Sequence, residues 1–184
     1  MTQRRLALMG VCVFASLSCS VSDSTGVEEW SWIGAGEGTY WYVPEESLQA
    51  ITWDPYSPSD YTFIDDQTVW HIEYYDNGYL AGPVVVKFEG YPRSCQYMIG
   101  SVAPDGEVHV SFTSLEEMPS ITTGTGHMVR EEGSFAFSMQ MASGNASVQV
   151  AHWAIMRKCT PDQDCWDDIP GSDATISELL ASCE

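Results

Sequence analysis

Acidic side chains and cysteines gather near the C-terminus, where residues 159–168 read CTPDQDCWDD. Carboxylate oxygens bind calcium, and an EF-hand loop places ligands at its first, third, fifth and twelfth positions, with glycine at the sixth. Counted from Asp162, Trp166 stands at the fifth position and Asp173 at the twelfth, so the pattern fails. We therefore expect an acidic surface loop closed by a disulfide. The alternative is weak calcium binding by the loop's four aspartates, Asp162, Asp164, Asp167 and Asp168.

Histidines and one glutamate are the other candidates for chemistry. The four histidines fall on four different predicted strands without the spacing of a zinc motif, so we expect structural, hydrogen-bonded roles for His71, His109, His127 and His152. No Gly-x-Ser-x-Gly nucleophile motif occurs. Glu73 shares a strand with Trp70 and Tyr75, and a glycan hydrolase needs a carboxylate pair beside its sugar. We expect no catalytic residue, metal or cofactor, with an extracellular glycan hydrolase as the alternative.

Four cysteines remain outside the N-terminal segment, and four cysteines in an oxidising compartment predict two disulfides with three possible pairings. We expect Cys159–Cys165, which closes a short local loop. Cys95–Cys183 would then link the C-terminal tail to the body of the domain. Buried free thiols are the alternative.

The N-terminus predicts export. Residues 1–18 join two arginines to a short apolar run, the layout of a signal peptide, and the run is too short to span a bilayer. Ser16-Leu-Ser-Cys19 resembles the lipobox of bacterial lipoproteins, which implies a lipid on Cys19 and a tether over residues 19–28. The alternative is cleavage after Ser18 or Ser20 and release of a soluble protein. Either way we expect a location in the cell envelope or outside the cell.

The charge of the chain restricts its partners. A formal net charge of −19 repels nucleic acid and anionic lipid, because phosphate binding relies on lysine and arginine. We therefore expect no nucleic-acid partner, and membrane contact only through the lipid anchor. Loose calcium binding by the acidic surface stays open, which would make the chain a structural surface protein.

Short alternations of apolar residues separated by turn signals predict an all-β domain over residues 29–184. The clearest hairpin joins residues 68–75 to residues 79–88 through Asn77-Gly78, because this pair tolerates the positive φ of tight turns. Other expected strands are 38–43, 48–53, 96–102, 107–113, 126–130, 134–141 and 147–157. We expect an antiparallel up-and-down meander of about eight strands, closed as a barrel rather than packed as a sandwich. Thr175-x-x-Glu178 predicts one short C-terminal helix.

Two predicted strands carry apolar side chains on both faces, namely residues 69–74 and 148–156. The extra apolar surface either binds a ligand or partner, or packs under a loop or the C-terminal helix. For the first alternative, the expected ligand-binding residues are the aromatic ones, Trp41, Trp70, Tyr74 and Trp153.

Two short matches resemble the lipocalins. Gly38-Thr-Tyr-Trp41 is similar to the Gly-x-Trp signature of the first lipocalin strand, and Arg157 is similar to the late arginine of that family. The resemblance implies an eight-stranded barrel that binds a small apolar ligand in its mouth without catalysis, and Cys95–Cys183 would suit it. The sequence thus predicts a non-enzymatic exported lipoprotein that binds a small apolar molecule inside, or a glycan or protein on its aromatic surface.

Overall fold

The computed structural model describes residues 30, 32–34, 39–115, 121–131, 133–144, 148–181 and 183. The predicted signal peptide 1–18, the lipidation site Cys19 and the tether 19–28 lie outside these residues. The elements are β1 (Tyr40–Tyr42), η2 (Glu45–Ser47), β2 (Gln49–Asp54), β3 (Ser57–His71), β4 (Tyr74–Asp76), β5 (Tyr79–Phe88), β6 (Ser94–Val102), β7 (Glu107–Ser114), β8 (Ile121–Glu131), β9 (Ser134–Gly144), β10 (Gln149–Cys159), η3 (Asp164–Trp166) and α1 (Ile176–Ala181).

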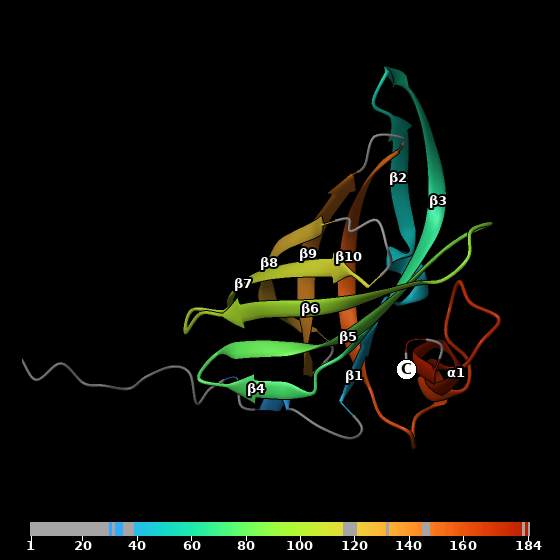
Figure 1. Cartoon of the computed structure of the whole chain (residues 1–184). Coiled ribbons are helices and arrows are strands. Elements are labelled where there is room, and N and C mark those ends of the chain that lie inside the picture. The colour runs from blue at the N-terminus through green and yellow to red at the C-terminus, as the bar shows by residue number, and fades with distance from the viewer. Residues whose placement is uncertain are drawn as a thin grey trace, which may run out of the picture.

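The strands form an eight-stranded antiparallel barrel, as predicted (Figure 1). Neighbours in sequence pair around the barrel, and β2 and β10 close it. β1 and β2 occupy one strand position, because both pair with β10 and with β3. The single turn of η2 interrupts this first strand. Among the described residues no helix is long and apolar enough to span a bilayer.

The turn between β4 and β5 has the predicted hairpin chemistry. Asn77 and Gly78 have φ angles of 49° and 81°, the left-handed values that a tight hairpin turn needs. Further along β5, Gly82 lies so close to β3 that an added Cβ would be 1.8 Å from the His71 carbonyl oxygen. Only glycine allows β5 to come this close to the end of β3. β3 ends at His71, and the chain resumes as β4 at Tyr74.

The barrel interior is filled by large apolar side chains. Trp41, Trp70, Phe137, Met98 and Met156 have no exposed surface. Trp30 and Trp32 pack with Phe135 at one end of this core, with ring centroids 4.9–6.2 Å apart. A side chain without exposed surface leaves no adjacent space that holds a water molecule. The barrel is therefore closely packed at this level.

A second, smaller core lies outside the barrel, under the C-terminal segment. Val69 and Val85, which face away from the first core, pack with Ile169, Ile176 and Leu179. The helix α1 begins with the predicted capping box. Thr175 Oγ1 accepts from the Glu178 backbone N–H at 3.2 Å, and the Glu178 carboxylate accepts from the Thr175 N–H at 2.9 Å.

Both predicted disulfides are confirmed. Cys95–Cys183 joins β6 to the chain end across 88 positions, and Cys159–Cys165 closes a loop across six positions. The two bonds thus hold the two ends of the C-terminal segment that covers the second core.

Removing the long disulfide should cost more stability than removing the short one. In the chain-entropy account the free energy lost grows with loop length, which predicts that the Cys95→Ser/Cys183→Ser variant loses about 2 kcal/mol more than Cys159→Ser/Cys165→Ser. Urea unfolding of the two double variants against the parent protein measures the difference. Equal losses would contradict the prediction.

Candidate functional site

The four aromatic residues predicted to bind a ligand do not lie together. Trp41 and Trp70 are register partners on β1 and β3, and both contact Phe137, with ring centroids 4.5 and 5.4 Å away. Tyr74 is exposed on β4, and Trp153 is exposed on β10. The structure therefore joins one pair inside the barrel and leaves the other two side chains on the outer surface.

The interior pair lies in a packed region. The Nε1 atoms of Trp41 and Trp70 are buried and have no hydrogen-bond partner among the described residues. Their rings lie against aromatic neighbours, since Trp41 meets Phe137 edge-on at 70°. An aromatic face is a weak acceptor for an N–H group. A ligand at this level would have to displace side chains.

An exposed apolar surface lies outside the barrel, across β10, β2 and β3. Register places its members on one face: Ala151 pairs with Ile51, Ile51 with Phe63, and Trp53 with Tyr61. Trp153, two residues beyond Ala151, shares this face because side chains alternate along a strand. We call this surface the aromatic face; its residues are Ile51, Trp53, Tyr61, Phe63 and Trp153.

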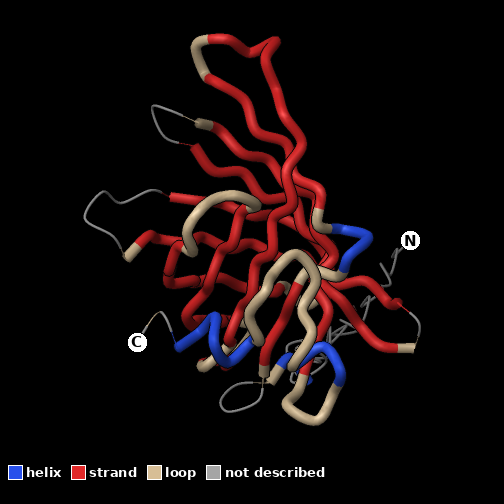
Figure 2. Tube along the Cα trace, turned by 90° about the vertical axis from the view of Figure 1, so that its right-hand side faces the viewer, coloured by secondary structure: helices blue, strands red, loops and turns tan. Residues whose placement is uncertain are grey.

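The aromatic face is open to solvent. Trp153, Tyr61 and Phe63 are 70%, 58% and 56% exposed, and Tyr61 and Phe63 touch edge to face at 5.8 Å. The hairpin of β2 and β3 extends beyond the rest of the barrel, so part of this face stands on a projecting arm (Figure 2). Clustered exposed aromatic side chains of this kind mark interaction surfaces.

The two strands that were predicted to carry apolar side chains on both faces differ in whether their outer face is covered. On β3, the outward side chain of Val69 is covered by the C-terminal segment. On β10, the outward side chain of Trp153 stays exposed. Packing under the C-terminal helix accounts for the outer apolar side chain on β3. In the described part of the chain, no element covers Trp153 on β10.

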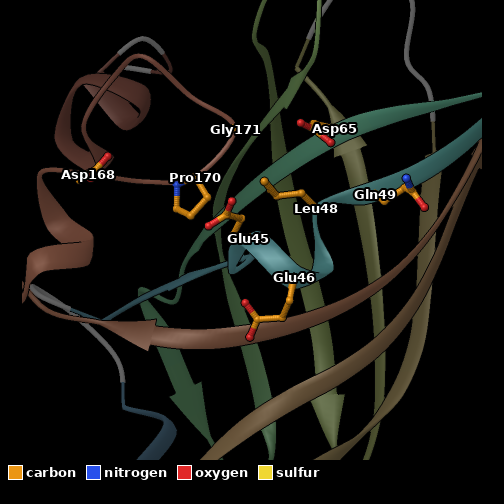
Figure 3. Close-up of a pocket in the computed structure, with 8 residues that line it drawn as sticks. All are labelled: Glu45, Glu46, Leu48, Gln49, Asp65, Asp168, Pro170 and Gly171. Atoms are coloured by element: carbon orange, nitrogen blue, oxygen red, sulfur yellow. The ribbon is translucent and has the colours of Figure 1, made fainter.

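An acidic pocket of about 570 Å³ lies at the foot of the aromatic face (Figure 3). Gln49 of β2 and Asp65 of β3, which are register partners, form the side nearest Ile51 and Phe63. The full lining is Glu45, Glu46, Leu48, Gln49, Asp65, Asp168, Pro170 and Gly171. The pocket therefore lies between the interrupted first strand and the C-terminal loop. All the charged side chains that line it are carboxylates.

One of these carboxylates is already paired. Glu46 accepts from Arg157 Nη2 at 2.6 Å, while Glu131 accepts from Arg157 Nε and Nη2, each at 2.9 Å. The hydrogen bond from Arg157 holds the pKa of Glu131 below its usual range, and burial opposes this shift. Arg157 thus links β10 to β8 and η2 through carboxylates.

The strand interruption is held by a buried polar cluster. His152 Nδ1 lies 2.9 Å from Asp66 Oδ2, and its Nε2 lies 2.6 Å from the Ser47 carbonyl oxygen. Asp66 also accepts from Thr68 Oγ1 at 3.1 Å. Burial lowers the pKa of His152, but the hydrogen bond and charge of Asp66 and the Ser47 carbonyl outweigh it, so the pKa lies above its ordinary value.

The remaining histidines occupy simpler settings. His71 stacks on Tyr40 at 4.4 Å, and its Nδ1 lies 3.8 Å from the carboxylate of Glu73. His109 lies on the surface 3.2 Å from Glu107, and His127 is exposed. In the described ranges, no three histidine, cysteine or acidic side chains gather as metal ligands.

Sequence reasoning singled out Trp153 and His152 but not their neighbours. It did not identify β3 before Thr68 as a strand, and so missed Tyr61, Phe63 and Asp66. The alternation Tyr61-Thr-Phe63 was the available signal. Comparisons with family models, with curated proteins and with solved structures found no match for this chain.

Proposed function

We propose that this protein is a non-enzymatic, exported binding module whose partner lies across the aromatic face. The observation that carries the proposal is the gathering of exposed aromatic side chains from three adjacent strands on one outer face. Aromatic residues bury about 150–250 Å² each, and tryptophan and tyrosine are enriched among the residues that dominate binding energy.

A surface partner agrees better with the packing than a small apolar ligand inside the barrel. The interior side chains around Trp41 and Trp70 have no exposed surface, whereas Trp153 is 70% exposed. Binding on the outside therefore needs no rearrangement of the core, and the cost of displacing packed side chains does not arise.

Export and attachment at the cell envelope are part of the same proposal. The two disulfides support an oxidising compartment, since cytosolic thiols are kept reduced. With the predicted lipid on Cys19, the tether would hold the barrel at a membrane surface while the aromatic face stays available to a partner.

The aromatic face is tested by removing two of its rings. A Phe63→Ser/Trp153→Ser variant and the parent protein are applied to arrays of glycans and of short peptides. We expect every probe that the parent retains to bind the variant at least about tenfold more weakly, which corresponds to about 1.4 kcal/mol.

The matched control removes two exposed rings elsewhere. Tyr79 and Tyr97 are 65% and 41% exposed on β5 and β6. A Tyr79→Ser/Tyr97→Ser variant should bind like the parent. If the parent retains no probe, or if the two variants lose binding equally, the proposal is wrong.

A further inference from the structure

The hairpin of β2 and β3, which carries four of the five residues of the aromatic face, has an unpaired edge. β3 pairs regularly with β2 from Tyr61 to Asp65 and, after a register shift, again at Ser57. Its pairing with β5 begins only at Asp66, opposite Phe88. Figure 1 shows β3 running past the end of β5 with β2 alongside. The first half of β3 is thus a strand with one neighbour.

Two hydrogen bonds show which backbone groups face that edge. The Asp66 N–H donates to the Leu48 carbonyl, toward β2, whereas the Asp65 carbonyl accepts from the Glu89 N–H, toward β5. Direction alternates along a strand. The N–H and C=O groups of Tyr61 and Phe63 therefore point to the free edge, and they have no backbone partner in the described part of the chain.

The protective features of this edge are confined to its start, where Pro58, Asp60 and the register shift lie. Natural edges are blunted by lysine, by bulges or by a covering element. Pro58 stands at the start of this strand, but Tyr61, Thr62 and Phe63 follow without a basic residue, and all three are exposed. An extended peptide can add to such an edge through main-chain hydrogen bonds, while pockets and rings select its side chains.

Charge decides which peptide fits. Residues 49–65 contain Asp54, Asp60 and Asp65 and no lysine or arginine, and Glu45 of the adjacent pocket adds a further carboxylate. A second copy of this chain would bring identical acids together, and opposed like charges destabilise strand pairing. A basic segment gains attraction, and its arginines can also stack on Tyr61 and Phe63.

We propose that an extended, basic polypeptide segment adds as a strand to the free edge of β3 and lays alternate side chains on the aromatic face. This inference rests on the proposed function, because it names the chemical class of the partner. The added strand pairs with Tyr61 and Phe63, and its basic side chains lie on the aromatic face beside Asp65, which shares that face with the two rings.

The probes are immobilised peptides of about five residues, which match the regular part of the free edge from Tyr61 to Asp65 at about 3.3 Å per residue. One set alternates lysine or arginine with valine, isoleucine or tyrosine. A second set replaces every basic residue by glutamate. A third repeats the basic set with N-methyl groups on alternate backbone nitrogens, which removes the donors for strand addition and keeps the side chains.

We expect the parent protein to retain members of the basic set and none of the acidic set. N-methylation on the edge-facing residues should weaken binding at least about tenfold. An Asp65→Lys variant should lose binding to a similar degree. Asp167→Lys is the matched control and should bind like the parent protein. Both carboxylates are exposed, and neither accepts a side-chain hydrogen bond within the described residues. Added salt should weaken the interaction.

The outcomes separate this inference from the proposed function. If N-methylated peptides bind as tightly as the unmethylated basic peptides, or if only glycans are retained, strand addition is wrong. The proposal that the aromatic face binds a partner would then remain valid. If no basic peptide is retained, the inference is overturned. A dimer of the parent protein at the concentrations used, abolished in Asp65→Lys, would assign the edge to a second copy and also overturn it.

Discussion

Replacing Trp70 by alanine should lower the free energy of unfolding by about 3–5 kcal/mol, the usual cost of truncating a buried large aromatic side chain. Trp70 has no exposed surface and lies 5.7 Å from Phe112 and 5.4 Å from Phe137, centroid to centroid. Its removal opens a cavity in the middle of the barrel, because the surrounding strands are paired on both sides and cannot close the space.

The comparison with Trp153→Ala makes this prediction specific. The residue type and the change are the same, but Trp153 is 70% exposed, so its loss should shift stability by about 0.5 kcal/mol or less. Urea unfolding followed by circular dichroism measures both variants. If the two lose similar amounts of stability, the assignment of inner and outer faces is wrong. Because Trp153 variants should keep their stability, a loss of binding in such a variant can be assigned to the missing ring.

Replacing His152 by alanine should lower the free energy of unfolding by about 3–5 kcal/mol below neutral pH, because it leaves the Asp66 carboxylate buried and uncompensated. Both side chains are nearly inaccessible, with exposed fractions of 2% for His152 and 7% for Asp66. The effect also reaches the strand interruption, since His152 Nε2 binds the Ser47 carbonyl of η2 at 2.6 Å.

The same residue should make stability depend on pH. Burial in the folded state lowers the pKa of His152, but the hydrogen bond and charge of Asp66 and the hydrogen bond to Ser47 together outweigh it and raise the pKa. A raised pKa means that the folded protein binds the proton more tightly than the unfolded chain does. The stabilisation is therefore complete below the ordinary histidine pKa of about 6.5, and it is lost as the pH rises through the folded-state pKa.

Unfolding titrations across this pH range, in the parent protein and in His152→Ala, isolate the contribution. The parent should lose stability as the pH rises, and the variant should lose less. His109→Ala is the control, because His109 is an exposed histidine that also faces a carboxylate, Glu107. An unchanged pH slope in His152→Ala would show that the buried pair does not exchange its proton in this way.

Features that depend on neighbouring residues were predictable from the sequence. Asn77-Gly78 predicted its hairpin because positive φ is a local requirement, and Thr175-x-x-Glu178 predicted its helix because a capping box closes within one turn. Alternation predicted the strands of the meander, and closure into a barrel followed from the need to remove free edges. Even the Cys159–Cys165 bond follows from short spacing.

Features that depend on distant residues required the tertiary structure. The first half of β3 contains Pro58, Asp60 and Asp65, which disfavour strands, yet pairing with β2 makes it one. His152 and Asp66 meet across 86 positions. Trp70 and Trp153 both stand in strands with two apolar faces, so alternation separates the faces without saying which is inside. Only the path of the barrel decides that Trp70 fills its core while Trp153 remains exposed, because burial is a property of the whole packing arrangement.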